Sequence, residues 1–190
     1  TDTYTFSGDE NGETFVPSFT SHGFRYVEIT GNGCELSDIS CVTSLEGLVL
    51  CNTPDTTGSF ECSDPLVNQL QSNIQWGQRG NSLLVYTDCP QRNERMGWTG
   101  DAQVFAPTAA FNMDVQSFMN KWLLDVRDGQ LMYNRHGAVP DTAPLGGDNR
   151  PAGCAGWADA SVIVPWEMYL AYGDTRVLEE NYECMARWIA

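Results

Sequence analysis

The residues of this chain best suited to chemistry are gathered in one short segment, Asp88–Asp101. Its sequence, DCPQRNERMGWTGD, holds three carboxylates, two arginines and a tryptophan. One proline and two glycines in it argue against a single long helix. Apolar residues precede it at 83–86 and follow it at 104–106. A charged loop anchored on both sides by core-forming segments indicates a partly buried polar site.

Three carboxylates in a confined loop are suited to proton transfer. Asp88, Glu94 and Asp101 cannot all ionise at ordinary pKa values in one site, because proximity and burial raise the pKa of one of them. The resulting carboxylic acid can protonate a leaving group near neutral pH, while the arginines hold the other carboxylates ionised. The plainer interpretation of the same residues is a salt-bridged loop that joins two helices.

Two tryptophans indicate the kind of ligand. Trp98 in the segment and Trp157 farther along the chain offer flat apolar faces that suit the C–H face of a sugar. Nucleophilic catalysis is less supported, because His22 and His136 lie in no nucleophile motif. No Walker-type phosphate loop or dinucleotide fingerprint is present. The residues therefore favour a carbohydrate site.

Seven cysteines leave the disulfide state open. Because their number is odd, at least one thiol is free or intermolecular. Cys34 and Cys41 are spaced to close a small disulfide loop in an oxidising compartment, and buried free thiols explain them equally well. The chain has no C-x-x-C pair and only two histidines, so we expect no metal site.

The composition narrows the class of partner. A net charge of −15 makes an acidic surface that repels phosphate backbones and anionic lipids, so neither nucleic acid nor a membrane is expected as a partner. The chain is 42% hydrophobic, which is enough for a packed core. No apolar run reaches the roughly 18 residues of a transmembrane helix. We expect a soluble protein, and the sequence leaves open a cytoplasmic or secreted location and the oligomeric state.

The chain changes character near residue 60. Residues 24–30 and 44–50 alternate apolar and polar side chains or follow strand composition, so each predicts a strand. Two or three strands cannot bury an apolar face alone. We therefore expect residues 1–60 to be the end of a β domain that begins outside this chain.

From residue 61 onward the patterns are helical. Ser63 as N-cap and Pro65 in the first turn predict a helix that ends near Gly77 and Gly80. A second helix is placed to start at Asp114 and to end near Gly129. Its apolar face consists of Val115, Phe118, Met119, Trp122, Leu123 and Val126.

A long loop and two further helices complete the pattern. Residues 131–156 contain three prolines and predict a loop, and loops of this length are usually functional. A helix is expected over 158–172, kinked or restarted by Pro165. Gly173 breaks it, and an amphipathic helix then runs to Ala190. No later segment covers its apolar stripe, so we expect the C-terminus to be cut as well.

The segment Asp88–Asp101 closely resembles the signature of the bacterial-type α-L-rhamnosidases, family 78 of the glycoside hydrolases. The resemblance extends over roughly residues 14–190. Further segments resemble the same family in the family's order, and they are residues 19–26, 58–63, 101–105, 121–123, 156–160 and 164–167. Residues 19–26 resemble the strand that closes the family's β-sandwich.

The resemblance implies a mixed fold. Residues 1–60 would be the C-terminal edge of a β-sandwich domain, and residues 61–190 the first helices of an (α/α)6-barrel catalytic domain. It also implies inverting hydrolysis of terminal α-L-rhamnosides, so the partners are L-rhamnose-containing glycosides. Inverting enzymes place an acid and a base about 6.5–9.5 Å apart around a water, and they need no metal or organic cofactor.

The family's site residues can be carried over by position. Glu94 resembles the general acid. Five residues resemble sugar ligands, namely Asp88 and Asp101 for the hydroxyls and the tuning of Glu94, with Arg92, Trp98 and Trp157 as further contacts.

Two departures from the family pattern matter. Asn93 stands where the family usually has aspartate, which predicts tuning of Glu94 and not loss of activity. The family's general base is a glutamate from a later part of the barrel, and no residue here matches it. We expect the 190 residues alone to carry the acid half of the site and to lack appreciable hydrolase activity.

Two alternatives stay open. One is another (α/α)6-barrel glycosidase that acts on a different sugar. The other is a carbohydrate-binding module without catalysis. Glu94 separates the second alternative from an enzyme, because a binding module has no need of a protonatable carboxyl group between two others.

Overall fold

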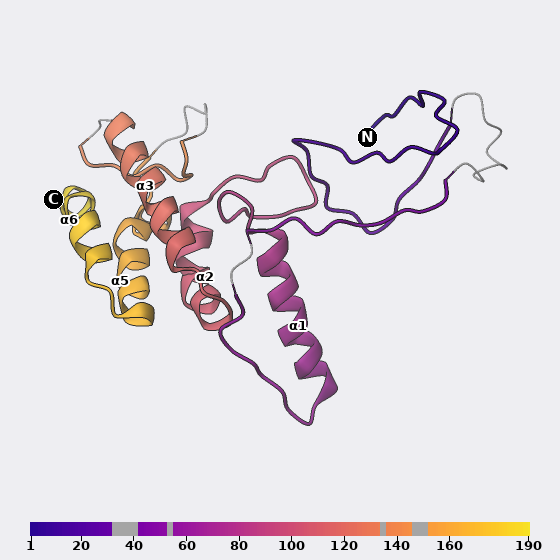
Figure 1. The fold of residues 1–190 in the computed structure, drawn as a ribbon. Helices are drawn as coiled ribbons and strands as arrows, with labels where there is room; N and C mark the ends of the chain where they lie inside the picture. The colour runs from indigo at the N-terminus through magenta and orange to yellow at the C-terminus, as the bar shows by residue number, and fades with distance from the viewer. Residues whose placement is uncertain (32–41, 53–54, 134–135, 146–151) are drawn as a thin grey trace. The chain divides into compact units, whose positions relative to one another are not determined.

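A computed structural model describes residues 1–31, 42–52, 55–133, 136–145 and 152–190. The chain divides into two compact units, Thr1–Glu46 and Gly47–Ala190. In the described ranges the regular elements are six helices, all in the second unit (Figure 1). The cysteines Cys34 and Cys41 lie outside the described residues.

The two predicted strands are not formed. Among the described residues neither 24–30 nor 44–50 takes part in a ladder. Strands need paired neighbours to satisfy their backbone groups, and two or three of them are not stable alone. Local contacts shape the first unit instead, where the Tyr4 and Phe15 rings stack with centroids 4.8 Å apart. The Glu13 carboxylate accepts the backbone N–H of Ser7 at 2.9 Å. The described residues of this unit therefore do not show the edge of a β-sandwich.

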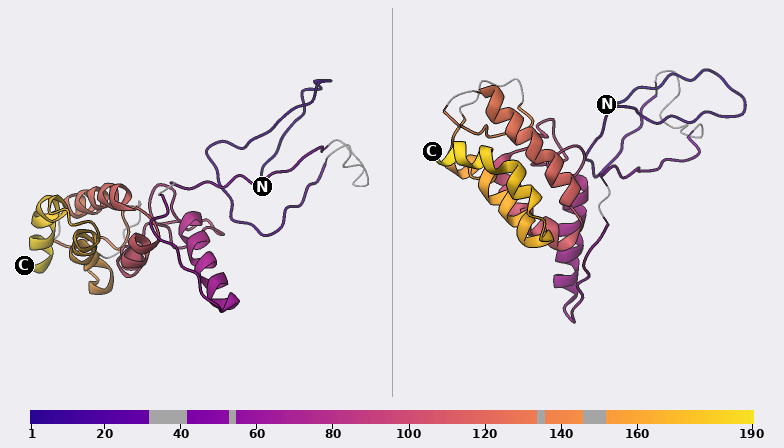
Figure 2. Two further views of the ribbon diagram at one scale, coloured as in Figure 1. Left: turned by 60° about the horizontal axis from the view of Figure 1, so that its bottom comes forward. Right: turned by 60° about the vertical axis from the view of Figure 1, so that its left-hand side comes forward.

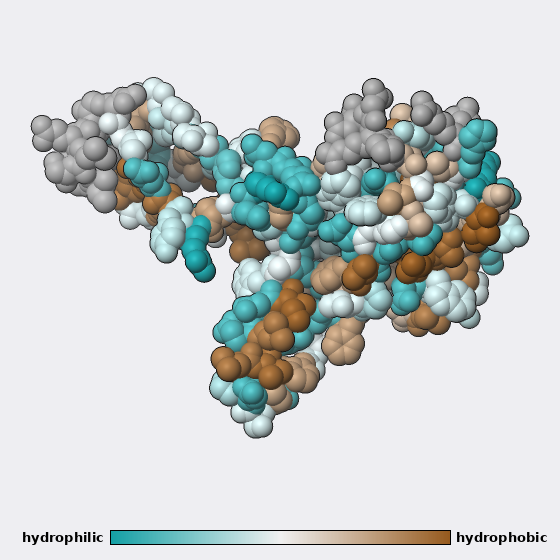
Figure 3. Space-filling view, turned by 180° about the vertical axis from the view of Figure 1, so that it is seen from behind, coloured by the Kyte–Doolittle hydropathy of each residue, from teal (hydrophilic) through white to brown (hydrophobic). Residues whose placement is uncertain are grey.

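Helix α1, Pro65–Gly80, confirms the helix that was predicted after residue 63. Its N-cap is Asp64 instead of Ser63, since the Asp64 carboxylate accepts the Leu66 N–H at 2.8 Å. Several of its apolar side chains, among them Leu66 and Leu70, remain exposed, and Figure 3 shows an apolar surface along α1. The buried residue of α1 is polar Gln78.

Helix α2, Thr99–Asn112, was not predicted. Its composition is apolar on nearly all sides, so it lacks the helical period that marks a surface helix. It also contains Pro107, and a proline inside a segment predicts a break in the helix. Small residues explain its packing, because Ala102, Ala106 and Ala109 are buried along one face and let neighbouring helices approach.

Helix α3, Gln116–Tyr133, confirms the second predicted helix and buries its whole predicted face. The carboxylate of Asp114 accepts the Gln116 N–H at 3.2 Å at its start. The helix continues past Gly129, where an end was predicted. Glycine serves packing there, because a Cβ would lie 2.8 Å from Cγ of Pro140.

The last three helices are α4, Ala155–Ala158, which begins inside the predicted loop, α5, Ala160–Tyr172, and α6, Arg176–Ile189. Helix α5 runs through Pro165 without restarting. Gly173 ends it with a left-handed φ of 67°, as the predicted break requires.

The second unit is built around α5. Helix α5 packs against α2, α3 and α6, and both views of Figure 2 show these four helices together. The largest fully buried side chains include Trp122, Met113, Met119, Leu123 and Met168. This core fixes the start of α2 and the loop before it. No described helix combines the length and apolar character that crossing a membrane requires.

Candidate functional site

The predicted site segment forms the loop that leads into α2. Its last residues pair with the loop after α3, where Ala143 N–H donates to the Gly97 carbonyl at 2.9 Å. The N–H of Thr99 donates to the Asp141 carbonyl, also at 2.9 Å. These bonds hold the intervening Trp98 between the two loops.

The approach of the two loops requires glycine and a core tryptophan. A Cβ at Gly97 would lie 2.1 Å from the Ala143 carbonyl oxygen. That oxygen also accepts the indole N–H of buried Trp122 at 2.9 Å. The buried core of α3 therefore sets the position of the site loop.

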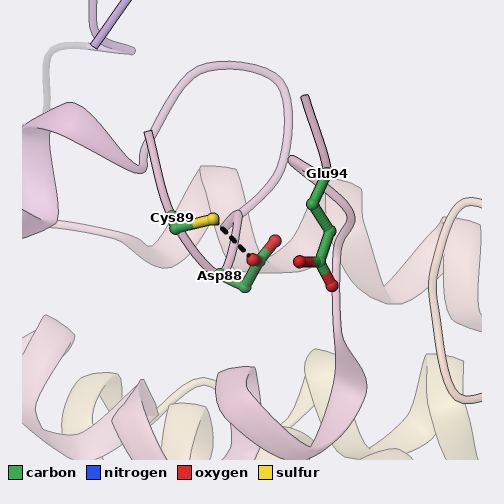
Figure 4. A group of neighbouring side chains, drawn as sticks. All are labelled: Asp88, Cys89 and Glu94. Atoms are coloured by element: carbon green, nitrogen blue, oxygen red, sulfur yellow. Dashed lines mark hydrogen bonds between the residues drawn. The ribbon is translucent and has the colours of Figure 1, made fainter. Parts of the chain in front are cut away.

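Five residues of this loop form what we call the acid cluster: Asp88, Cys89, Arg92, Glu94 and Trp98. Oε1 of Glu94 accepts the Trp98 indole N–H at 3.1 Å, and Oε2 pairs with the Arg92 guanidinium. The Arg92 guanidinium also lies 3.6 Å from Oδ2 of Asp88. Figure 4 shows the two carboxyl groups facing each other, with the Cys89 thiol beside Asp88.

The Asp88 carboxylate accepts several hydrogen bonds. Burial alone raises its pKa, but hydrogen bonds from the Cys89 thiol, from backbone N–H groups including Met96, and from Glu94 outweigh burial. The net pKa of Asp88 is therefore below its ordinary value. Asp88 is an ionised hydrogen-bond acceptor at neutral pH.

Asp88 also lines a cavity of about 650 Å³. Asp101, in the first turn of α2, and Trp157 of α4 line it together with Asp88. Other lining residues include Gln78, Asn81, Tyr86, Thr87 and Phe105. The structure thus brings Asp88, Asp101 and Trp157 together at the cavity. It places the other three predicted residues in the acid cluster, and Asp88 belongs to both.

Trp157 connects the cavity with the acid cluster. Its ring centroid lies 6.5 Å from that of Trp98, with the planes at 59°. The Gln103 amide donates to the Gly156 carbonyl at 3.1 Å and so ties α4 to α2. Gly100 leaves room for this contact, since a Cβ there would lie 3.0 Å from Cδ1 of Trp157.

Sequence reasoning missed three residues of the site. Cys89 lies within the signature but was counted only as a cysteine. Gln78 is buried and donates to the Tyr86 hydroxyl at 3.3 Å and to the Ala109 carbonyl at 3.2 Å. Burial raises the pKa of Tyr86 to about 12, so its phenol is neutral at the cavity wall. No pattern marks Gln78 or Tyr86, because tertiary packing alone brings them together.

Three potential metal-ligating residues lie close together in the acid cluster, since ligand atoms of Asp88, Cys89 and Glu94 are within 4.8 Å of one another. The Arg92 guanidinium contacts both carboxyl groups and the sulfur, the latter at 3.2 Å from Nε. The chain itself therefore supplies a positive charge to this group of ligands. The cysteines outside it that the structure describes, at positions 51, 62, 154 and 184, are free thiols.

Comparisons with known proteins match the chain to one family. Residues 55–190 match the family model described as the bacterial α-L-rhamnosidase six-hairpin glycosidase domain. Residues 1–50 match the concanavalin-like domain of bacterial α-L-rhamnosidase. The helical second unit thus agrees with the predicted class of catalytic domain.

Individual relatives give the same result. An α-L-rhamnosidase of Streptomyces avermitilis is 50% identical over 189 residues, which cover 100% of this chain and 18% of the relative. One of Formosa agariphila is 44% identical over 187 residues, covering 98% of this chain and 20% of the relative. The chain thus spans about a fifth of the length of these curated relatives.

A solved structure resembles the fold directly. The crystal structure of the Streptomyces avermitilis α-L-rhamnosidase complexed with L-rhamnose aligns with a TM-score of 0.69 at 50% identity. The alignment covers 73% of this chain and 13% of that one.

Proposed function

Because the chain belongs to the bacterial α-L-rhamnosidase family of glycosidases, we propose that the protein hydrolyses terminal α-L-rhamnosides with Glu94 as proton donor. One observation carries the proposal. The Glu94 carboxyl group lies against Asp88, and Asp88 also lines a cavity that an aromatic wall borders.

The cavity is the proposed rhamnose subsite. Its volume of about 650 Å³ falls in the range of about 300–1,000 Å³ common for small-molecule sites. Asp88 and Asp101 accept hydrogen bonds from the sugar hydroxyls, and Trp157 covers the apolar face of the ring. The relative solved with L-rhamnose supports this sugar.

The acid cluster supplies the proton. Glu94 transfers its proton to the glycosidic oxygen as the bond from that oxygen to the anomeric carbon breaks, so the aglycone leaves as an alcohol. Water attacks the anomeric carbon from the opposite face and loses a proton to a general base. We assign no residue of this chain to that base.

Asp88 is a ligand and not the base in this scheme. Its oxygen lies within 4.8 Å of the Glu94 carboxyl group, whereas an inverting pair needs about 6.5–9.5 Å to hold the water. Hydrogen bonds from Cys89 and the Met96 N–H also occupy one lone pair on each of its two oxygens.

The test is hydrolysis of an aryl α-L-rhamnoside by the full-length protein, followed by proton NMR of the first product. We expect turnover with the β anomer of rhamnose formed first. The α anomer first would overturn the inverting scheme and favour Asp88 as a nucleophile, because retaining pairs lie about 5–5.5 Å apart. Turnover of a different aryl glycoside in place of the rhamnoside would favour another sugar. Saturable rhamnose binding without turnover would favour a binding module.

A further inference from the structure

Cys89 joins two members of the acid cluster through its thiol. The S–H donates to Oδ2 of Asp88 at 2.7 Å, and the sulfur accepts Nε–H of Arg92 at 3.2 Å. A thiol offers one donor and a weak acceptor, so both of its capacities are in use. The proposed chemistry uses Asp88 and Arg92 but leaves Cys89, which touches both, without a task.

Arg92 is the residue that needs such a tether. Its side chain is 64% exposed, and an exposed ion pair does not by itself hold a long side chain in one orientation. The bond from Nε to the sulfur fixes the plane of the guanidinium. In that plane Nη2 faces Glu94 and Asp88 together.

Asp88 is held from the same point. The thiol occupies Oδ2 and the Met96 N–H occupies Oδ1 at 3.2 Å, so the carboxylate cannot rotate freely. The carboxylate is therefore held in one orientation where it lines the cavity.

We propose that Cys89 is a positioning residue for sugar binding, whose thiol aligns the Asp88 carboxylate and the Arg92 guanidinium as one unit. This inference rests on the proposed function. Cys89 itself does not touch the sugar, so its substitution acts through its two partners.

The test compares Cys89→Ala with Cys89→Ser in the full-length protein. We expect Cys89→Ala to raise the rhamnose Kd and the KM for an aryl α-L-rhamnoside about tenfold, the effect of losing one hydrogen bond to a charged group. Serine retains a donor and an acceptor, so it should restore both constants to within about threefold of the unmodified protein. The matched control is Cys62→Ala, because that thiol also hydrogen-bonds, to the Asp64 carbonyl at 3.5 Å, but lies outside the cluster.

A pH series separates positioning from simple loss of structure. The Cys89 hydrogen bond lowers the pKa of Asp88, so its removal lets that pKa rise. Rhamnose binding by Cys89→Ala should therefore fail at a higher pH on the acid side than binding by the unmodified protein or the control. An unchanged acid limb would contradict the inference.

Arg92→Lys removes the bond between Arg92 and the Cys89 sulfur from the exposed arginine side. This variant does not depend on the folding of Cys89→Ala. Lysine keeps the charge but lacks the Nε donor, so KM should rise to a similar degree. The double variant with Cys89→Ala should be less weakened than the product of the two single losses, because both substitutions remove the same bond from Arg92 to the sulfur, whereas fully additive losses would overturn the inference. If the unmodified protein neither binds rhamnose nor hydrolyses the rhamnoside, the proposed function falls and the inference with it. If it does both and Cys89→Ala matches it, the positioning role alone falls.

Discussion

The acid cluster and the cavity share Asp88 but are held in place by different forces. In the cluster, side chains of one loop bind one another through polar contacts, and the Glu94 side chain is 27% exposed. At the cavity, the ends of α1, α2 and α4 meet over buried residues such as Gln78 and Ala102. The comparison indicates that proton transfer and sugar binding can be damaged separately. Substitutions that remove a charged or acidic group should impair the acid cluster, and substitutions that change side-chain volume should impair the cavity.

Glu94→Gln should give the largest effect, and it should reduce turnover without weakening rhamnose binding. Glutamine keeps the size and accepts the Trp98 N–H but has no acidic proton. We expect turnover of an aryl α-L-rhamnoside to fall by about 10²–10⁴-fold, the usual contribution of general acid catalysis. The rhamnose Kd, followed by tryptophan fluorescence, should stay within about threefold. Exposed Glu179→Gln is the matched control, and equal losses in both variants would contradict the role of Glu94.

Trp122→Ala should affect both the acid cluster and the cavity, because the same buried core supports them. Its indole is buried and donates to the Ala143 carbonyl that supports the site loop. The cost should be about 3–5 kcal/mol of unfolding free energy, as for other buried tryptophans. Urea unfolding measures it. Trp122→Phe should cost less, and a loss below about 1 kcal/mol for alanine would show that the core does not support the loop.

Gly100→Ala should affect the cavity and spare the cluster. The added Cβ would lie 3.0 Å from both the Gly156 carbonyl and the Trp157 ring, so Trp157 must shift. We expect rhamnose binding to weaken about tenfold, within the 1–3 kcal/mol that overpacking costs, with little change in kcat. Gly77→Ala meets nothing within 4 Å and should instead stabilise α1 by about 0.5–1 kcal/mol. If Gly100→Ala lowered kcat by as large a factor as it weakened rhamnose binding, proton transfer and sugar binding would not be separable.

A pH series with Asp88→Asn tests the charge of the residue that the acid cluster and the cavity share. The folded pKa of Asp88 lies below its ordinary value. Ionised Asp88 therefore stabilises the fold above the unfolded pKa of about 3.9, and this contribution is lost as the pH falls through the folded pKa. We expect the stability gap between the unmodified protein and Asp88→Asn to narrow below about pH 4. A gap that is constant with pH would contradict the ionised state.

The smallest effect should come from a polar contact remote from both parts. Lys121 and Asp125 form an ion pair one turn apart on α3, with the lysine 55% exposed. Lys121→Ala should change unfolding free energy by only about 0.3–0.5 kcal/mol. A rhamnose Kd identical to that of the unmodified protein would complete this control.

Helix α3 and the strands show what sequence patterns could and could not predict. The face from Val115 to Val126 is buried as its period predicts, because one apolar stripe needs one neighbour. Helix α2 was missed because it is apolar on several faces and contains Pro107. The strand patterns at 24–30 and 44–50 identify residues fit for a sheet, but a ladder depends on partners that a local pattern cannot supply.

The same limit applied to the candidate site. The signature supplied five of the six predicted site residues and a separate segment supplied Trp157, and the roles of all six remain predictions. It did not reveal that they divide between a cluster and a cavity around Asp88. Gln78 and Tyr86 reach the cavity through packing of α1 against the loop and α2, which leaves no local pattern.

The central claim is that Glu94 faces the glycosidic oxygen of a rhamnoside whose ring lies in the cavity. The most direct test is a crystal structure of the full-length Glu94→Gln protein with an aryl α-L-rhamnoside. We predict hydroxyls bound to Asp88 and Asp101, and the glycosidic oxygen within about 2.6–3.2 Å of the residue 94 side chain. A sugar bound outside the cavity, or a glycosidic oxygen directed away from residue 94, would contradict this account.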